Sequence, residues 1–209
     1  MDTVYKVILG LLACCLLYLC CNSILTPIRF NEQRDAREKV VVERLKDIRA
    51  AEQEYRKIKG AYTDNMDTLI DFVKNEKDVV IRKEGELTDK QLEEGLTERK
   101  AVALGLIRRD TTYVSIQESL FGTDYPVDSL RYIPFSNGKE FEMEVGETTD
   151  RGGNIIKLMV CRADYKTYLG DLDKQELANL IQLQTNLERY PGLKFGDVET
   201  PNNNAGNWE

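Results

Sequence analysis

The chain has 209 residues, with 29 Lys and Arg against 36 Asp and Glu, and its formal net charge is −7. This balance argues against nucleic acid as a partner, because affinity for a phosphate backbone rests on clustered basic side chains. No histidine is present. The commonest general base and metal ligand is therefore missing, and we predict no catalytic, cofactor-binding or metal-binding residue and no enzymatic activity.

The first predicted element is a membrane-spanning helix. The run from Val7 to Leu25 carries no charge, and at about 1.5 Å per residue a helix of this length crosses a hydrocarbon core of roughly 30 Å. Tyr5 and Phe30 flank the run as interfacial aromatics, and Pro27 predicts a kink or an end of the helix. We therefore predict a membrane anchor over residues 1–30, with the span at about 7–25, and a soluble domain over 31–209.

Two processed forms of the N-terminus are alternatives to an uncleaved anchor. One is a cleaved signal peptide, although no clear small-residue cleavage site follows the apolar run. The other is lipidation at Cys14, because Leu11–Cys14 (LLAC) resembles a lipobox. The uncleaved anchor is preferred, since the stretch before Cys14 is short and more apolar sequence follows it. Cys161 is the one cysteine beyond this run, which excludes a disulfide within the soluble part.

The charges around the anchor leave its orientation open. Basic residues follow the apolar run closely, and a count of positive charges alone would place the soluble domain in the cytoplasm. However, acids are interleaved with these bases, and the segment opens a large domain. The charge rule predicts the translocation of such domains poorly.

A long amphipathic helix is predicted over residues 31–59. Gly60 stands where a helix C-cap belongs, after basic residues in the last turn. Asn65 can cap a short second helix. Apolar residues recur at spacings of three and four along both helices, at Val41, Leu45, Ile48, Ala51 or Glu52, Tyr55 and Ile58 in the first, and at Met66, Leu69, Ile70 and Val73 in the second.

The next segment is predicted to hold two short strands and a charged helix. Lys77–Lys83 is short and rich in β-branched residues, which favours a strand. Thr88 and Gln91 have the spacing of a capping box, ahead of a helix to about Glu98. Thr111–Ile116 is typical of another short strand.

The C-terminal half predicts an antiparallel sheet. Glycine-bearing turns separate three extended runs, and in the second run apolar residues alternate with glutamates. The runs are Leu130–Phe135, Glu140–Val145 and Ile155–Arg162. Asp173 with Glu176 then caps a last helix, whose apolar residues are Leu177, Leu180, Ile181, Leu187 and Tyr190. The tail, Pro201–Glu209, is irregular, and Trp208 can dock it on the domain. The fold class is therefore α+β.

Few residues have the spacing of a known site. Asp171, Asp173 and Glu176 resemble the start of a calcium loop, but the glycine and glutamate that such a loop needs later are absent. Helix capping explains these acids more simply. Gly152-Gly153 is typical of a hairpin turn. Cys161 lies in a predicted strand without a histidine to activate it, which predicts a buried structural thiol.

The stretch from Arg44 to Val73 resembles the corresponding part of type IV pilins and type II secretion pseudopilins. In those proteins an aromatic residue ends the helix after the membrane segment, and a Gly-x-Tyr and a leucine follow. The corresponding residues here are Tyr55, Gly60, Tyr62 and Leu69. The resemblance implies an anchor helix, an amphipathic spine packed on an antiparallel sheet, and a periplasmic soluble domain on the inner membrane.

The resemblance does not extend to the processing signal of these families. Val7–Leu25 contains no glutamate, the start of the chain does not have the pattern of a short basic leader, and Pro27 separates the predicted anchor from the spine. The resemblance therefore supports neither pilin-type processing nor assembly into a filament. The leading hypothesis is a non-enzymatic, membrane-tethered scaffold or assembly component of the bacterial cell envelope, acting through other envelope proteins or self-association. The alternative is a membrane-anchored binding or sensing domain for a small ligand or envelope polymer.

Overall fold

The computed structural model describes residues 2–84, 97, 100, 104 and 108–209. The helix predicted from Thr88 to about Glu98 lies outside the described residues, apart from residue 97. The chain divides into two compact units, one formed by residues 1–66 with 129–209 and the other by residues 67–128. The predicted boundary between an anchor at 1–30 and a soluble domain at 31–209 stays a prediction.

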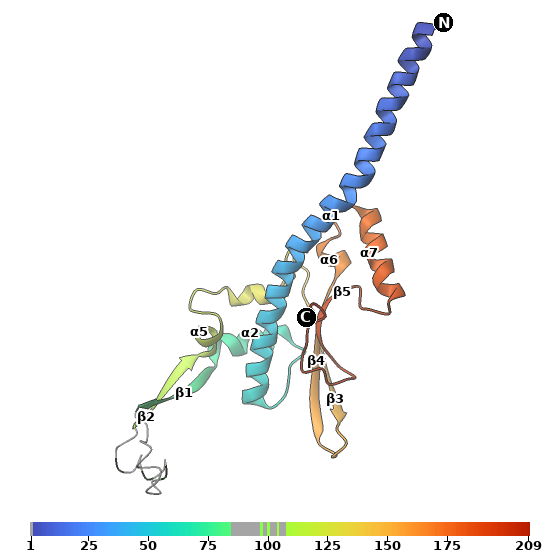
Figure 1. Cartoon of the computed structure of the whole chain (residues 1–209). Helices are drawn as coiled ribbons and strands as arrows, with labels where there is room; N and C mark the ends of the chain where they lie inside the picture. Colours follow the sequence, from blue (N-terminus) through green and yellow to red (C-terminus); the bar gives the residue numbers. More distant parts are fainter. Residues whose placement is uncertain (1, 85–96, 98–99, 101–103, 105–107) are drawn as a thin grey trace. The chain divides into compact units, whose positions relative to one another are not determined.

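One continuous helix, α1, forms the N-terminal part of the first unit. It runs from Asp2 to Lys59 and includes Pro27 (Figure 1), so of the two predicted outcomes at this proline, a kink or an end, the end of the helix is wrong. A proline inside a helix removes one backbone donor and crowds the preceding turn. The turns on both sides of Pro27 stay helical, so the apolar segment and the amphipathic segment belong to one helix.

The amphipathic part of α1 supplies much of the core of the first unit. Its C-terminal half contacts strand β5, Gly192–Asp197. The predicted stripe is confirmed at its centre, although Tyr55 is half-buried and Ile58 is 37% exposed at its end. The fully buried members of the stripe are Val41, Leu45, Ile48, Ala51 and Glu52. Gly60 ends the helix with φ of +80° and donates its N–H to the Arg56 carbonyl at 2.8 Å, as predicted.

A three-stranded antiparallel sheet packs in the same unit, in the order β3-β4-β5. β3 spans Glu142–Thr149 and β4 spans Ile155–Asp164. Glu142 pairs with Arg162 in the first ladder, and Cys161 pairs with Phe195 in the second. Apolar residues from β4 and β5 fill the core beside α1, namely Leu158, Met159, Val160, Cys161, Leu193 and Phe195.

The predicted meander is only partly correct. Ile155–Arg162 is confirmed within β4, and Glu140–Val145 overlaps β3, although Val145 is 39% exposed. Leu130–Phe135 is not a strand, because it begins in the 3-10 helix η1, Val127–Arg131, and continues into a turn with a single bridge from Tyr132 to Glu140. Pro134, which lacks a backbone donor, lies inside this stretch and disfavours strand pairing. The third strand is β5 instead.

Two helices connect β4 to β5. The short α6 covers Tyr165–Tyr168 and α7 covers Lys174–Asn186. The Asp173 carboxylate accepts hydrogen bonds from the Gln175 and Glu176 N–H groups, both at 3.0 Å, which confirms its predicted capping role. Of the predicted apolar face, Leu177 is buried, Leu180 and Ile181 are half-buried, and Leu187 lies beyond the helix and is 51% exposed.

The C-terminal tail docks on the first unit. Gly206 forms a bridge with Phe195 of β5. The Trp208 ring lies 6.0 Å from the Arg49 guanidinium, which also pairs with the Glu209 side chain at 2.6 Å. The predicted docking of Trp208 is therefore confirmed, and both contacts reach α1.

The second unit contains a two-stranded antiparallel sheet with short helices. Strands β1, Lys77–Glu84, and β2, Arg108–Ser115, pair from Lys77 with Ser115 to Glu84 with Arg108. Both strands were predicted. Helix α2, Met66–Asn75, precedes β1 and α5, Ile116–Leu120, follows β2. The mixed α and β class is confirmed, because the chain combines a long N-terminal helix with further helices and small antiparallel sheets.

Candidate functional site

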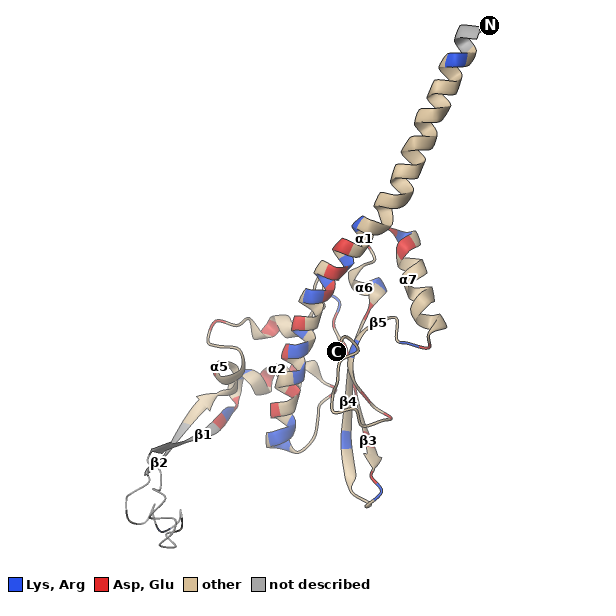
Figure 2. Cartoon of the chain, viewed as in Figure 1, with Lys and Arg blue, Asp and Glu red and all other residues tan. Residues whose placement is uncertain are grey.

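The apolar half of α1 is exposed along its whole length. All residues from Tyr5 to Leu25 are exposed, including Leu11 at 67% and Leu17 at 66%. The helix is long and apolar enough to cross a membrane, with a mean hydropathy of 2.3 in its most apolar window. Figure 2 shows that charged residues are almost absent from this half of the helix and are frequent in the other half. These properties are compatible with a membrane anchor, although a signal sequence shares them. They do not show in which compartment the rest of the chain lies.

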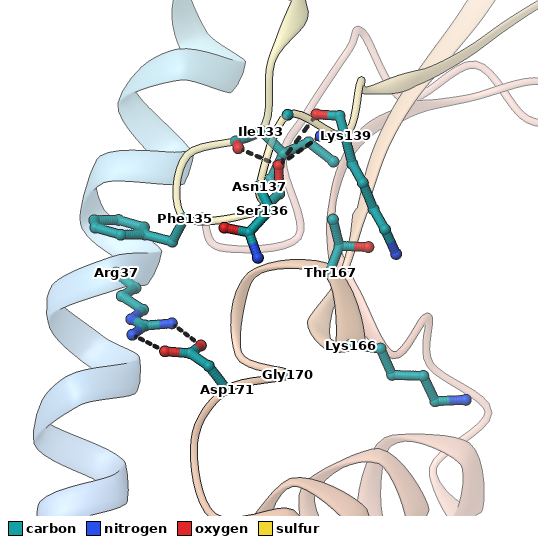
Figure 3. A pocket seen from close by; sticks show the side chains of 11 residues that line it. Arg37, Ile133, Phe135, Ser136, Asn137, Lys139, Lys166, Thr167, Gly170 and Asp171 are labelled. Carbon is teal, nitrogen blue, oxygen red and sulfur yellow. Dashed lines mark hydrogen bonds and ion pairs between the residues drawn. The ribbon is translucent and has the colours of Figure 1, made fainter.

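A polar cavity of about 630 Å³ lies in the first unit beside the charged half of α1. Three segments line it, which are α1 at Arg37, the turn over residues 133–139, and the segment from α6 to the start of α7 over residues 166–171. Figure 3 shows these segments facing one another. We call this space the loop cavity. Its size is within the range of small-ligand sites, but its lining is more polar than usual.

The turn over residues 133–139 is held in an unusual backbone conformation. Phe135 has φ of 64°, Asn137 53° and Gly138 85°. A left-handed conformation is unfavourable for a bulky aromatic residue. The buried Ser136 hydroxyl stabilises the turn, since it donates to the Ile133 carbonyl at 2.5 Å and accepts from the Lys139 N–H at 3.1 Å (Figure 3). This conformation exposes the Phe135 ring at the rim of the loop cavity, where the residue is 51% exposed.

Arg37 and Asp171 form one wall of the loop cavity. The Arg37 guanidinium donates to both Asp171 oxygens, with one bond at 2.7 Å, and to the Tyr168 carbonyl at 2.7 Å. It also lies 5.1 Å from the centre of the Phe135 ring, within cation–π range. The hydrogen bond from Arg37 holds the pKa of Asp171 below its ordinary value. The Asp171 charge is therefore compensated within the wall.

Two lysines add positive charge to the same cavity. Lys139 and Lys166 both line it and are exposed, and no salt bridge to a carboxylate joins either one within the described part of the chain. Figure 3 shows the Lys139 side chain running along the cavity toward Thr167, whereas the Lys166 side chain extends away from the 133–139 turn. With Arg37 cancelled by Asp171, the lining carries two excess positive charges.

A buried carboxylate, Glu52, lies on the core side of α1. It is 0% exposed. One of its oxygens accepts from the Thr63 N–H at 3.2 Å, and the other has no hydrogen-bond partner among the described residues. Burial raises the pKa of Glu52 to about 8, partly opposed by the Thr63 bond. This group lacks an opening to solvent, so we treat it as a feature of the core and not as a binding site.

The acids that resembled a calcium loop serve separate structural roles. Asp173 caps α7 and Glu176 lies in its first turn, as predicted, whereas Asp171 pairs with Arg37 and does not cap the helix. Among the residues whose side chains the structure describes, no group of three or more is suited to a metal ion.

The other two sequence features are where they were predicted to be. Gly152 and Gly153 lie in the turn between β3 and β4, where the Asp150 side chain accepts from the Gly152 N–H at 2.7 Å. Cys161 is completely buried in β4, and burial raises the pKa of its thiol.

The loop cavity was not predicted from the sequence. Its cations, Arg37, Lys139 and Lys166, are distant from one another in the sequence, and no motif joins them. Ser136–Lys139 was interpreted as a simple turn. The local signal was the run of turn-forming residues that ends in Lys139. This run does not indicate that α1 and residues 166–171 lie beside it.

The chain matches no protein-family model, no curated protein and no solved structure. Its long apolar N-terminal helix and antiparallel sheet are compatible with the layout of pilin-like proteins.

Proposed function

We propose that this chain is a non-enzymatic, membrane-tethered scaffold or assembly component of the bacterial cell envelope. In this role α1 holds the rest of the first unit at a fixed orientation to the inner membrane, on the periplasmic side. The chain then acts through contacts with other envelope proteins or with further copies of itself. The observation that carries the proposal is the continuity of α1 from its exposed apolar half to its buried amphipathic half.

The continuity of α1 matters because it restricts the orientations that a tethered domain can adopt relative to the membrane. A flexible linker lets a domain sample many orientations. Within α1 the apolar run passes directly into the stripe that begins at Val41, with no non-helical residue between them. A rigid connection of this kind suits a subunit whose surfaces must meet partners at a fixed height and angle.

The pilin-like stretch supports the same proposal. Tyr55 and Gly60 are at the end of the spine helix, as the resemblance implies. The Tyr62 hydroxyl accepts from Arg56 at 2.9 Å and from the buried Asn204 at 2.8 Å, which joins the end of α1 to the C-terminal tail. One expected departure also disappears, since Pro27 does not separate the anchor from the spine.

Accessibility of an added cysteine tests the membrane anchor and its orientation. We would introduce Arg151→Cys, in the exposed turn between β3 and β4, and replace Cys14, Cys15, Cys20 and Cys21 by alanine, keeping the buried Cys161. In cells with an intact inner membrane, a membrane-impermeant maleimide should label this chain. After fractionation, the labelled chain should be in the membrane fraction. Labelling that requires lysis would contradict the periplasmic location, and a chain in the soluble fraction would contradict the anchor. The parent chain without Arg151→Cys is the control.

Co-purification tests the assembly role. The full chain, solubilised in a mild detergent, should elute as an oligomer or with other envelope proteins. A detergent-bound monomer without partners, even after cross-linking in cells, would overturn the scaffold proposal.

A second candidate function is a membrane-anchored binding or sensing domain. The loop cavity favours it, because an opening of ligand size with uncompensated charge has no evident role in holding the fold together. This function does not conflict with the anchor, but it would give the first unit a ligand as its main partner.

A further inference from the structure

The loop cavity has a charge opposite to that of the whole chain. The chain has an excess of seven acids over bases, yet the lining of the cavity holds three bases and one acid, Asp171. Several other cations of the first unit are paired with carboxylates, as in Arg49 with Glu209, Arg162 with Glu144 and Lys194 with Asp197. Lys139 and Lys166 are the members of the lining that lack such a partner in the described structure.

The polar groups of the cavity fit an anion with several oxygens. Lysine ammonium groups bind phosphate as point charges. The Asn137 carboxamide and the Thr167 hydroxyl line the same space and can donate hydrogen bonds. The charge of the Arg37 guanidinium is balanced by Asp171, to which it donates two hydrogen bonds, so the excess positive charge of the lining is that of the two lysines. Two excess charges match a phosphate monoester, which carries about −1.5 to −2 at neutral pH, better than a single carboxylate.

We infer that the loop cavity binds a phosphate group, with Lys139 and Lys166 neutralising it and Thr167 and Asn137 donating to its oxygens. This inference rests on the second candidate function and is independent of the scaffold role. The Arg37–Asp171 pair shapes the wall, and the exposed Phe135 ring offers an apolar surface to whatever carries the phosphate. The bearer can be a soluble molecule or polymer, or a lipid headgroup.

The length of α1 bears on these two sources. At 1.5 Å per residue, Arg37 lies about 18 Å along the helix beyond Leu25, the last residue of the apolar run. The headgroup layer on each side of a bilayer is only about 5–8 Å thick. A helix standing close to the membrane normal would therefore hold the cavity beyond the headgroups, which favours a soluble phosphate.

Lysine footprinting of the full chain in dodecylmaltoside, which contains no phosphate, tests the inference. An amine-reactive reagent is applied with increasing inorganic phosphate at constant ionic strength, and modification of each lysine is followed by mass spectrometry. We expect a saturable, several-fold fall in the reaction rates of Lys139 and Lys166. The exposed Lys39 and Lys46 of α1, in the same sample, should be unchanged. Lys139→Gln should also abolish the protection of Lys166, whereas Lys39→Gln, with the same charge change, should not.

Further arms separate the sources and the competing outcomes. In phosphatidylcholine nanodiscs, protection by added phosphate supports a soluble ligand. Protection without added phosphate, when phosphatidic acid is included, supports a headgroup. Protection by phosphate that persists in Lys139→Gln, or no protection under any condition, overturns the inference. Protection by the neutral sugar N-acetylglucosamine and not by phosphate would overturn it too, while leaving a binding function in place.

Discussion

Glu52 occupies a position where the pattern of α1 calls for an apolar side chain. It follows Ala51 on the buried stripe and shares a core with Cys161, whose pKa is raised further when Glu52 is ionised. Burial of a carboxylate favours its protonated form, which needs only modest hydrogen bonding. With the pKa of Glu52 raised to about 8, the folded protein holds this proton at neutral pH.

The raised pKa predicts a stability that falls with rising pH. In the unfolded chain Glu52 loses its proton near the ordinary glutamate pKa of 4.5, whereas in the folded chain it does so near 8. Between these values the folded state binds more protons, so stability declines across this window and levels off above it. Glu52→Gln, which stays neutral, should lack this decline and gain stability relative to the parent between pH 5 and pH 9. The gain should be on the order of a few kcal/mol, at about 1.4 kcal/mol per unit of pKa difference.

The pH dependence of stability can be measured by urea unfolding of the full chain in detergent. The fluorescence of Trp208, the single tryptophan, reports the unfolding. Glu43→Gln is a matched control, because Glu43 is exposed on the same helix. If the stabilities of the parent and of Glu52→Gln change with pH in parallel, Glu52 is ionised in the folded protein at neutral pH and the prediction is wrong.

At the scale of elements, the stripe on α1 contributes one side of the core of the first unit. Leu45 is 0% exposed at the centre of this stripe, and Val40 is 40% exposed on another face of the same helix. Leu45→Ala should destabilise the chain by about 2–5 kcal/mol, because it removes buried methyl groups and leaves a cavity. Val40→Ala should change stability by less than about 0.5 kcal/mol. Equal effects in urea unfolding would mean that α1 does not pack as described.

The same elements show what the sequence could predict. Helical periodicity identified the buried stripe of α1, and local capping chemistry identified Gly60 and Asp173, because both signals lie within a few residues of their effect. β5 was missed because it holds two glycines and a lysine in six residues, and its pairing with β4 is set by tertiary contact. Leu130–Phe135 had the composition of a strand, but Pro134 lacks a backbone donor and Phe135 is in the left-handed conformation, so the segment forms a turn. The loop cavity escaped prediction because its walls meet only after α1, α6 and the 133–139 turn have packed.

At the scale of the whole molecule, the charge pattern of α1 divides one helix between two solvents. The exposed run to Leu25 suits a bilayer, and the charged half beyond it suits water and the core of the first unit (Figure 2). Because both halves share one helix, any face of the first unit has a fixed rotation about the axis of the anchor. A scaffold would depend on that rotation, whereas a loosely tethered binding domain would not.

Insertions between Leu25 and Thr26 test whether the rotation matters. Each added residue turns an α-helix by about 100°, so two alanines rotate the first unit by about 200° relative to the anchor, and four restore it to within about 40°. Alanine keeps the helix continuous. If the scaffold proposal is correct, the two-residue insertion should abolish co-purification of envelope partners or self-association, and the four-residue insertion should preserve most of it. Protection of Lys139 and Lys166 by phosphate should survive both insertions, since the cavity lies wholly beyond the insertion point. Equal assembly by both chains would mean that α1 serves as a tether without directional control, and the binding function would then be the better account of the protein.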